Sequence, residues 1–324
     1  MRSWSRRRSA CSDAAVPEPD SAAAPSAAPS GARIGAPVGV PTPRYTPPVR
    51  SIVVVPTYCE AENIAGLLRA IRAAAPATDV LVVDDDSPDG TGRIAEEVGA
   101  EVGGVRVLHR VRKEGLGAAY RHGFRVALDD GYDVVAQMDA DLSHEPAVLP
   151  QLLDALVGGA EVAVGSRYVP GGSIPNWTRF RRGLSRWGNG YARWMLRLTV
   201  RDATSAFRAY RSEVLERIDI DGTRANGYLF QIETAYRLSA AGVRVQEVPI
   251  TFVDRVAGQS KMAVVRTMVE TELRVTWWGL SLRAPRLSSA FRRTPGGRYL
   301  ADRVAPMPLP QGPGAGGRGR DPEH

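Results

Sequence analysis

Residues 133–144 read Asp133-Val-Val-Ala-Gln-Met-Asp-Ala-Asp-Leu-Ser-His144, a short apolar run that ends in two carboxylates, Asp139 and Asp141. Side chains two residues apart in a β-strand point to the same face, so both acids are expected to project together from the end of a strand. In open α/β sheets, ligand crevices lie outside the carboxyl ends of the strands. Two such acids suit a divalent cation that keeps its other positions for water and phosphate oxygens. The triplet alone leaves open a loop whose aspartates cap a helix that begins near Pro146.

Apolar runs and helical spacing alternate on both sides of this stretch. Expected strands span residues 49–56, 79–83, 105–108, 133–138, 161–165, 204–210 and 243–252. Expected helices span residues 60–75, 115–128, 179–200, 230–240 and 262–282, with two more that begin near 91 and 146. This alternation predicts an α/β fold with a largely parallel sheet covered by helices on both faces.

Composition bounds the domain organisation. The chain has 324 residues, of which 44% are hydrophobic, and a formal net charge of +7, which favours an anionic partner such as a nucleotide, a phospholipid surface or nucleic acid. Residues 1–48 and 283–324 are rich in Ala, Pro, Ser, Gly and Arg and are expected to be disordered tails. They leave a domain at 49–262, with a nucleotide and metal half at 49–146 and an acceptor half at 147–262, and an amphipathic helix at 263–282.

The sequence gives no sign of export or of a membrane span. The basic residues 1–8 are followed by no apolar core, and no apolar stretch reaches the roughly 18–20 residues that a spanning helix needs. We therefore expect a soluble or peripheral protein. Cys11 falls in the predicted tail and Cys59 follows the first strand, so we expect no structural disulfide and a reducing compartment.

Two further polar clusters follow strands. In Val83-Asp-Asp-Asp-Ser-Pro-Asp-Gly-Thr91, adjacent carboxylates repel unless they bind donors or cations, so Asp84 and Asp85 are interpreted as ligand contacts. Asp89 is interpreted as part of a turn, with either Asp89 or Thr91 capping the next helix. In Pro56-Thr-Tyr-Cys-Glu60, an aromatic ring and a carboxylate can hold a nucleotide base, but an ordinary turn with Glu60 in the first helical turn fits equally well.

Arginine and tryptophan interleave in residues 179–200, where Trp187 and Trp194 lie among six arginines. This composition is typical of a helix that lies in an anionic membrane interface. The helix at 262–282 carries Trp277 and Trp278 together with charges that exclude a simple span. Core packing of amphipathic helices explains both segments equally well.

Several segments together resemble one known family. They are Val55-Pro-Thr-Tyr-Cys-Glu60, residues 83–91, Met138-Asp-Ala-Asp-Leu-Ser-His-Glu-Pro146, Gly165-Ser-Arg-Tyr168, residues 202–210, residues 227–233, residues 248–255 and Gly258-Gln-Ser-Lys261. In this order they resemble the polyprenol-phosphate (dolichol-phosphate) mannose synthases, inverting glycosyltransferases of family two with the GT-A type, Rossmann-like nucleotide-diphospho-sugar transferase fold. Cys59 and Ala206 depart from the usual Asn and Gly of that family.

The resemblance implies residue roles. Pro56, Tyr58, Glu60 and Asp85 would contact the nucleotide of a sugar donor. Asp139 and Asp141 would hold Mg²⁺ or Mn²⁺ against its diphosphate. Ser143 falls where some members carry a further metal ligand, and Lys113 either approaches the donor diphosphate or is a solvated residue before a helix.

The chemistry expected from the resemblance is inverting transfer of mannose from GDP-mannose to a polyprenyl monophosphate, or the same transfer from another donor such as UDP-glucose. The acceptor oxygen is already anionic, so the obstacle is repulsion between two phosphorylated molecules, which arginines can screen. Candidates that hold the lipid phosphate are Arg167, Arg181, Arg182, Arg255 and Lys261, and the expected catalytic residues are Asp141, Arg167 and Arg208.

Location and rival functions follow from the same features. The expected location is the cytoplasmic face of the plasma membrane, as a peripheral enzyme on an anionic surface, and a separate membrane-anchoring partner is left open. A phosphoacceptor signalling domain also sets acids at strand ends, but it does not explain the Arg/Trp segment. Nucleic-acid binding is disfavoured because base-stacking aromatics interleaved with basic residues are absent from residues 50–150.

Overall fold

The computed structural model describes residues 49–253, 261–283 and 293, with backbone alone for residues 261–270. Seven strands form one sheet in the order β3-β2-β1-β4-β6-β5-β7. Their bounds are β1 Ser51–Thr57, β2 Thr78–Asp84, β3 Val105–His109, β4 Val134–Gln137, β5 Val162–Ser166, β6 Arg208–Arg211 and β7 Val245–Pro249. All neighbouring strands run parallel except β6, which is antiparallel to both β4 and β5. The expected, largely parallel sheet is confirmed, with one reversed strand inside it.

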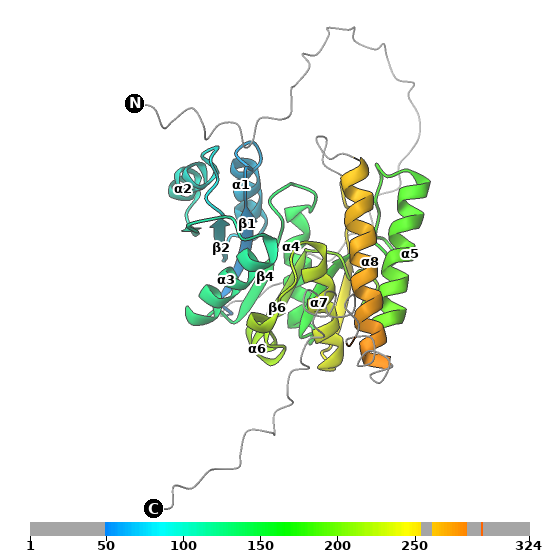
Figure 1. Cartoon of the computed structure of the whole chain (residues 1–324). Coiled ribbons are helices and arrows are strands. Elements are labelled where there is room, and N and C mark those ends of the chain that lie inside the picture. The colour runs from blue at the N-terminus through cyan, green and yellow to red at the C-terminus, as the bar shows by residue number, and fades with distance from the viewer. Residues whose placement is uncertain (1–48, 254–260, 284–292, 294–324) are drawn as a thin grey trace, which may run out of the picture.

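Helices cover both faces of the sheet, as expected (Figure 1). One layer contains α1 Ile64–Ala74, α2 Thr91–Val102 and α4 Leu149–Val157, which η2 Pro146–Val148 precedes. The other contains α3 Leu116–Asp129, α5 Arg179–Leu196, α6 Ser212–Arg217, η3 Ile220–Gly222, α7 Tyr228–Ala240 and α8 Lys261–Arg283. In α1, four fully buried apolar residues recur at helical spacing, Ile64, Leu67, Leu68 and Ile71, so burial of this stripe explains why the segment is a helix.

The helices α5 and α8 lie side by side in the outer layer (Figure 1). A Cβ on Gly279 of α8 would come within 2.0 Å of the Met195 side chain of α5, so this glycine permits the close approach. Trp277 and Trp278 are buried, with 7% and 8% of their surface exposed, whereas Trp187 and Trp194 of α5 are 59% and 61% exposed. Core packing therefore accounts for the tryptophans of α8, but it does not account for those of α5.

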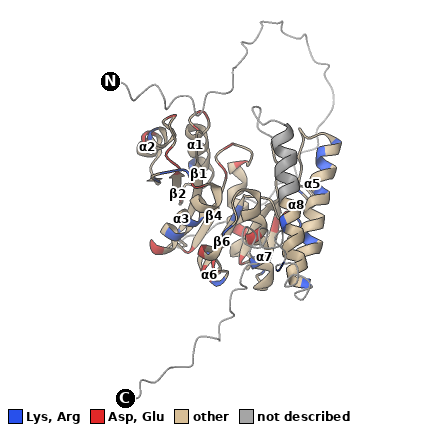
Figure 2. Ribbon diagram, in the orientation of Figure 1, with Lys and Arg blue, Asp and Glu red and all other residues tan. Residues whose placement is uncertain are grey.

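Charge is distributed unevenly over this layer. The 18 residues of α5 include five arginines and no carboxylate, and Figure 2 shows Lys and Arg along that helix. The Arg283 guanidinium lies 4.6 Å from the centroid of the Trp194 ring and adds another cation to the same end of the pair. No helix among the described residues is long and apolar enough to span a membrane.

The expectation of no structural disulfide stays a prediction, because the chain offers Cys59 only one possible partner. The second cysteine of the chain, Cys11, lies outside the described residues.

Candidate active site

One edge of the sheet collects the predicted site residues. The parallel strands β1, β2, β3, β4, β5 and β7 all end there, and antiparallel β6 begins there. Residues that follow six strands and residues that precede the seventh therefore meet at the same edge. Side chains that lie far apart in the sequence come together for this reason.

The loop after β1 forms one corner of the edge. The Nζ of Lys113 lies 3.6 Å from the centroid of the Tyr58 ring, so two predicted donor contacts are in direct cation–π contact. Cys59 has a positive φ of 58°, which turns the chain sharply after Tyr58. Glu60 donates its N–H to Thr91 Oγ1 at 2.9 Å, and its carboxylate accepts from Asn63 Nδ2 at 2.8 Å. Pro56 is buried within β1, opposite Val83 of β2.

Asp84 and Asp89 shape the loop after β2. Asp84 is 3% exposed and accepts from Thr57 Oγ1 at 2.9 Å, Ser87 N at 3.0 Å and Ser87 Oγ at 2.6 Å. Its carboxylate therefore holds the turn together, and the ligand contact expected of Asp84 stays a prediction. Asp89 accepts from Thr91 N and Ala61 N at 3.1 Å, so it lies in a turn as predicted, but the N-cap residue of α2 is Gly90.

Asp85 faces a cation that the sequence did not reveal. Its Oδ1 accepts from Arg110 Nη1 at 2.5 Å, and its Oδ2 accepts from the N–H groups of Glu114 and Gly115 at 3.3 and 3.4 Å. Arg110 and Asp85 are both more than nine-tenths buried. The pair fixes the loop that carries Lys113 against the end of β2.

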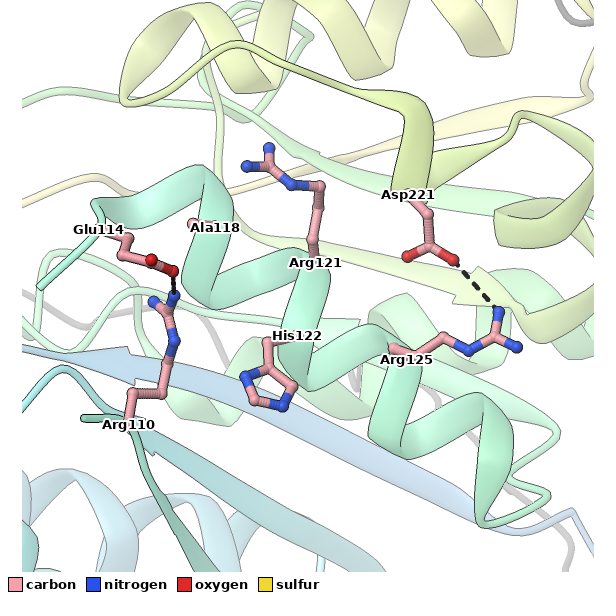
Figure 3. A pocket seen from close by; sticks show the side chains of 7 residues that line it. All are labelled: Arg110, Glu114, Ala118, Arg121, His122, Arg125 and Asp221. Carbon is pink, nitrogen blue, oxygen red and sulfur yellow. Dashed lines mark hydrogen bonds and ion pairs between the residues drawn. The ribbon is translucent and has the colours of Figure 1, made fainter. Parts of the chain in front are cut away.

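A cavity of about 370 Å³ continues from this pair along α3. It is lined by Arg110, Glu114, Ala118, Arg121, His122, Arg125 and Asp221. Arg110 and Glu114 form an ion pair at one end, and Arg125 and Asp221 form another at 3.1 Å at the other end (Figure 3). Burial lowers the pKa of Arg121, which donates to Thr223 Oγ1 and the Ala225 carbonyl at 3.4 Å. The lining cations therefore have protein partners, and we assign this cavity no ligand.

Asp139 and Asp141 follow β4, as expected. Tyr120 donates its hydroxyl to Asp139 Oδ1 at 2.7 Å, and Ser143 donates its N–H to Asp141 Oδ1 at 3.1 Å. Burial raises the pKa of Tyr120 well above its usual value, and the charges of both Asp139 and Asp141 raise it further. The charges of both carboxylates therefore act on the same buried phenol. Leu142, with a positive φ of 58°, then turns the chain away from them.

The chemistry of this pair fits Mg²⁺ or Mn²⁺. Among the described residues, no group of three or more Asp, Glu, His or Cys side chains is arranged to hold a metal. Asp139 and Asp141 are two carboxylates, and Mg²⁺ is commonly bound through one or two carboxylates together with water and substrate phosphates. The Ser143 hydroxyl also donates to Asp141, so Ser143 orients that acid, and its expected direct ligation of the metal stays a prediction.

Arg167 lies just after β5 in a buried ion pair. Its Nε and Nη2 donate to Asp202 at 2.7 and 2.6 Å, and its N–H donates to the same carboxylate at 2.9 Å. Burial alone would raise the pKa of Asp202, but the charge and hydrogen bonds of Arg167 offset it and lower that pKa. Arg167 is 8% exposed and Asp202 is 0% exposed. A fixed guanidinium therefore faces the same edge as the acid pair.

Arg208 has a different role from the catalytic one expected of it. It is fully buried in β6, opposite Gln137 of β4. Its Nε donates to the Ser205 carbonyl at 2.9 Å, and its Nη2 donates to the carbonyls of Ala203 and Gln231 at 2.8 and 3.1 Å. Arg208 thus holds the loop before β6 in the core. The difference follows from burial, because a guanidinium inside the protein needs hydrogen-bond partners and Arg208 finds them in main-chain carbonyls.

The remaining predicted phosphate ligands divide into three groups. Arg181 is exposed, and its guanidinium packs 4.1 Å from the centroid of the Trp177 ring. Arg182 donates Nη2 to the carbonyls of Ile174 and Trp177 at 3.1 and 3.2 Å. Arg255 and the side chain of Lys261 lie outside the described residues.

Comparisons with known proteins bear on this arrangement. The family model for glycosyl transferase family 2 matches residues 52–219, which is more than half of the chain. An undecaprenyl-phosphate mannosyltransferase from Micrococcus luteus is 48% identical over 235 residues, which cover 72% of this chain and 96% of the relative. A polyprenol monophosphomannose synthase from Mycolicibacterium smegmatis is 45% identical over 247 residues, which cover 76% and 93%.

The chain belongs to glycosyl transferase family 2.

Solved structures agree with the family on the fold. A glucosyl-3-phosphoglycerate synthase from Mycobacterium tuberculosis, in complex with Mn²⁺, UDP-glucose and glycerol 3-phosphate, matches with a TM-score of 0.54 at 20% identity, covering 71% of this chain and 80% of that one. A mannosyltransferase from Pyrobaculum calidifontis, in complex with GDP-Man and Mn²⁺, matches with a TM-score of 0.50 at 20% identity, covering 81% of each chain. The GT-A type fold expected from the resemblance is confirmed, and this member of glycosyl transferase family 2 is a glycosyltransferase.

The part of the chain matched by the family 2 model contains the Tyr58 corner, the acid pair and the Arg167–Asp202 pair. Reasoning from sequence missed Arg110, Tyr120 and Asp202. Tyr120 and Arg110 carry no signal in the sequence, because their partners are 19 and 25 residues away. Asp202 is the first residue of the segment 202–210, which contributes to the family resemblance. Its place in that segment was the sequence signal that could have identified it.

Proposed function

We propose that this glycosyltransferase moves mannose from GDP-mannose to a polyprenyl monophosphate with inversion at the anomeric carbon. The observation that carries the proposal is the identity of 45–48% over 93–96% of the length of two relatives whose names specify mannose and a polyprenol phosphate acceptor. The base of the donor and the stereochemistry rest on the resemblance to polyprenol-phosphate mannose synthases.

The donor would lie over the ends of β1, β2 and β4. Tyr58 and Lys113 offer a ring face and a cation for the nucleotide, and Asp85, held by Arg110, offers a carboxylate for donor hydroxyl or N–H groups. Asp139 and Asp141 would hold Mg²⁺ or Mn²⁺, which would neutralise charge on the leaving diphosphate. Tyr120 and Ser143 keep the two carboxylates in place.

The acceptor would approach from the side of β5. Its phosphate oxygen is anionic at neutral pH, so no protein base has to remove a proton. Arg167 screens the repulsion between the acceptor phosphate and the donor diphosphate, and Asp202 keeps the guanidinium in one orientation. The acceptor oxygen forms the new bond to the anomeric carbon as the bond to the nucleoside diphosphate breaks. The leaving diphosphate takes the electron pair, and a single displacement inverts the centre.

The lipid acceptor requires contact with a membrane, and α5 offers a surface for it. Trp187 and Trp194 are exposed on a helix that contains five arginines and no acid. Exposed indoles beside cations suit the headgroup region of an anionic bilayer. We propose that the enzyme is peripheral on the cytoplasmic face of the plasma membrane and docks through this helix.

The experiment is transfer of radiolabelled sugar into organic-extractable lipid by the purified full-length chain. GDP-mannose and UDP-glucose are offered separately with a polyprenyl monophosphate, with and without a chelator. We expect label from GDP-mannose only, its loss with the chelator, and a product anomer opposite to that of the donor by NMR. Turnover of UDP-glucose alone would contradict the proposed donor, and label that stays in the aqueous phase would contradict the lipid acceptor.

A further inference from the structure

A buried asparagine stands in the middle of α5, where helix propensity alone would not place one. Residues 188–190 read Gly-Asn-Gly, and both residue types are less favourable than Ala in the interior of a helix. Gly188 leaves room for α8, because a Cβ there would come within 2.9 Å of Glu272 Oε1. Asn189 is 5% exposed, so it is not on the helix surface for the sake of solubility. A polar side chain that breaks the local preference inside the protein points to a specific partner outside the helix.

Both ends of the Asn189 amide are used, and two of its bonds reach the segment 201–204, which contains the counter-ion of Arg167. Its Oδ1 accepts from the N–H of Ala203 at 2.9 Å, and its Nδ2 donates to Thr204 Oγ1 at 3.4 Å. The Nδ2 also donates to the carbonyl one turn earlier in α5 at 3.0 Å. An amide supplies an acceptor for the N–H and a donor for the carbonyl at the same time, which an apolar side chain of similar size cannot do.

The Thr204 hydroxyl joins Asn189 to the guanidinium of Arg167. It accepts from Arg167 Nη2 at 2.6 Å and donates to Asp202 Oδ1 at 3.3 Å, and that carboxylate oxygen accepts from the same Nη2. Asn189 thus binds the main chain beside the counter-ion and the hydroxyl that the guanidinium contacts. A shift of this segment relative to α5 would therefore move the atoms that orient Arg167.

Three side chains from three elements hold the segment 201–204, and Asn189 differs from the other two. Glu247 of β7 accepts from two N–H groups at the start of the segment, at 3.0 and 3.1 Å, and Arg208 of β6 donates to the Ala203 carbonyl at 2.8 Å. Those two bind main-chain groups of the segment. Asn189 also binds a side chain that contacts Arg167, so it acts most directly on the guanidinium.

The opposite face of α5 is the one that points outward. At 3.6 residues per turn, Trp187 and Trp194 lie roughly 140–160° around the helix from Asn189. Both tryptophans are mostly exposed, whereas Asn189 is buried. Asn189 therefore connects the buried face of the helix that we propose for membrane docking to the setting of Arg167.

We infer that Asn189 is a positioning residue for the transfer reaction, which holds the segment 201–204 so that Arg167 stays oriented for the phosphate of the acceptor. This inference deepens the proposed function and rests on it. Asn189 acts through Ala203 and Thr204 and has no contact of its own with either substrate. The ligand that depends on it is a phosphate monoester carried by a lipid.

The test measures kinetics of the full-length chain with a short, water-soluble prenyl monophosphate, so that membrane contact does not limit the rate. Asn189→Ala removes the whole amide. We expect the KM for the prenyl phosphate to rise roughly three- to tenfold, the range of one hydrogen bond, and the KM for the sugar donor to stay within about twofold. Ser239→Ala is the matched control, because the Ser239 hydroxyl accepts from the N–H of Thr199 at 3.0 Å, a bond of the same kind that does not lead to Arg167. Both KM values should stay unchanged in the control.

A double-mutant cycle with Arg167→Lys separates positioning from general packing. Lysine keeps the positive charge and has no Nη2 for the Thr204 hydroxyl to bind. In that background, Asn189→Ala should add less than about twofold to the acceptor KM. Thr204→Val is a second variant, which cuts the link to Arg167 and keeps the bond between Asn189 and the Ala203 N–H. It should raise the acceptor KM as well, and it decides the question if Asn189→Ala does not fold.

Each result supports or overturns the inference. Losses that multiply in the cycle, or a donor KM that rises as much as the acceptor KM in Asn189→Ala, would show that Asn189 acts only on general stability. If the wild-type enzyme transfers sugar to prenyl phosphate, an unchanged acceptor KM in Asn189→Ala or in Thr204→Val would overturn the inference alone. Wild-type protein that gives prenyl phosphate no sugar would overturn the proposed function as well.

Discussion

Replacing Asp202 by Asn tests whether the pair with Arg167 is built as the structure describes. Asp202 is fully buried and accepts three hydrogen bonds from Arg167, two of them from the guanidinium. Asn offers one acceptor oxygen and no charge, so the variant leaves a nearly buried guanidinium without its counter-ion. Breaking one side of a buried ion pair costs about 3–5 kcal/mol. For a domain of this size that corresponds to a fall in Tm of about 6–20 °C.

The pH dependence of this loss has a defined sign. The folded pKa of Asp202 lies below its ordinary value, so its contribution to stability is present above about pH 4, the unfolded pKa. It is lost as the pH falls through the folded pKa. Urea denaturation of both proteins should therefore show a constant difference in unfolding free energy from pH 8 to pH 5, which shrinks below about pH 4.

A cycle with Arg167→Met completes this test. The double variant contains no buried unpaired charge, so it should be more stable than Asp202→Asn alone. A loss below about 1 kcal/mol in Asp202→Asn, or a double variant whose losses simply add, would refute the coupling of Asp202 and Arg167.

Four further predictions follow from the site and the helix pair. Asp141→Ala should abolish metal-dependent transfer. It should change the unfolding free energy by less than about 1 kcal/mol, because a partly exposed acid beyond a strand end adds little to the core. Normal turnover would remove Asp141 from the site. Lys113→Ala should raise the KM for the sugar donor about two- to fivefold and leave the acceptor KM unchanged, because it removes a cation–π contact worth about 0.5–1 kcal/mol at an exposed position; equal effects on both substrates would contradict this. Replacing Trp187 and Trp194 together by Ala should weaken co-sedimentation with anionic liposomes and leave Tm almost unchanged, because both rings are mostly exposed; unchanged sedimentation would show that α5 is not the docking surface. Burial raises the pKa of Glu272 to about 7, so ionisation of Glu272 destabilises the folded state increasingly from about pH 4.5 to 7. Glu272→Gln should therefore stabilise the chain above pH 7 by roughly 1 kcal/mol, a value that is discounted for the partial exposure of the side chain. Thermal melts below pH 4.5 should show no gain.

Local patterns in the sequence predicted most elements of the fold. The run Val49 to Pro56 and the helical spacing from Ile64 to Ile71 became β1 and α1, because their apolar residues are the ones the core buries. The strand expected at 204–210 begins only at Arg208, since the residues before it form the loop that carries Asp202. The reversal of β6 was also missed, because strand direction depends on connections and leaves no mark on a short apolar run.

The candidate site was predictable where one residue's chemistry decided its role. The apolar run before Asp139 and Asp141 predicted their place after a strand, but β4 ends at Gln137, so the period of a strand does not decide how the two side chains point. Asp84 was interpreted as a ligand contact because of its charge, and Arg208 as catalytic because it lies in a segment of the resemblance. In the structure Asp84 accepts from Thr57 and Ser87, and Arg208 donates to main-chain carbonyls. Charge in a sequence does not reveal whether the group that neutralises it is a substrate, a main-chain carbonyl or another side chain.

The reversed strand explains how the acceptor side is assembled. Parallel strands can bring to this edge only the residues that follow them, such as Asp139 after β4 and Arg167 after β5. Because β6 runs the other way between those two strands, it brings the residues that precede it, and Asp202 thereby reaches Arg167 across a separation of 35 residues. Arg208 fixes that loop from inside the core through its bonds to Ala203 and Ser205. In the proposed function Arg167 stays oriented near two phosphorylated substrates, and its counter-ion comes from a segment whose position is set by the sheet and which Arg208 holds in place.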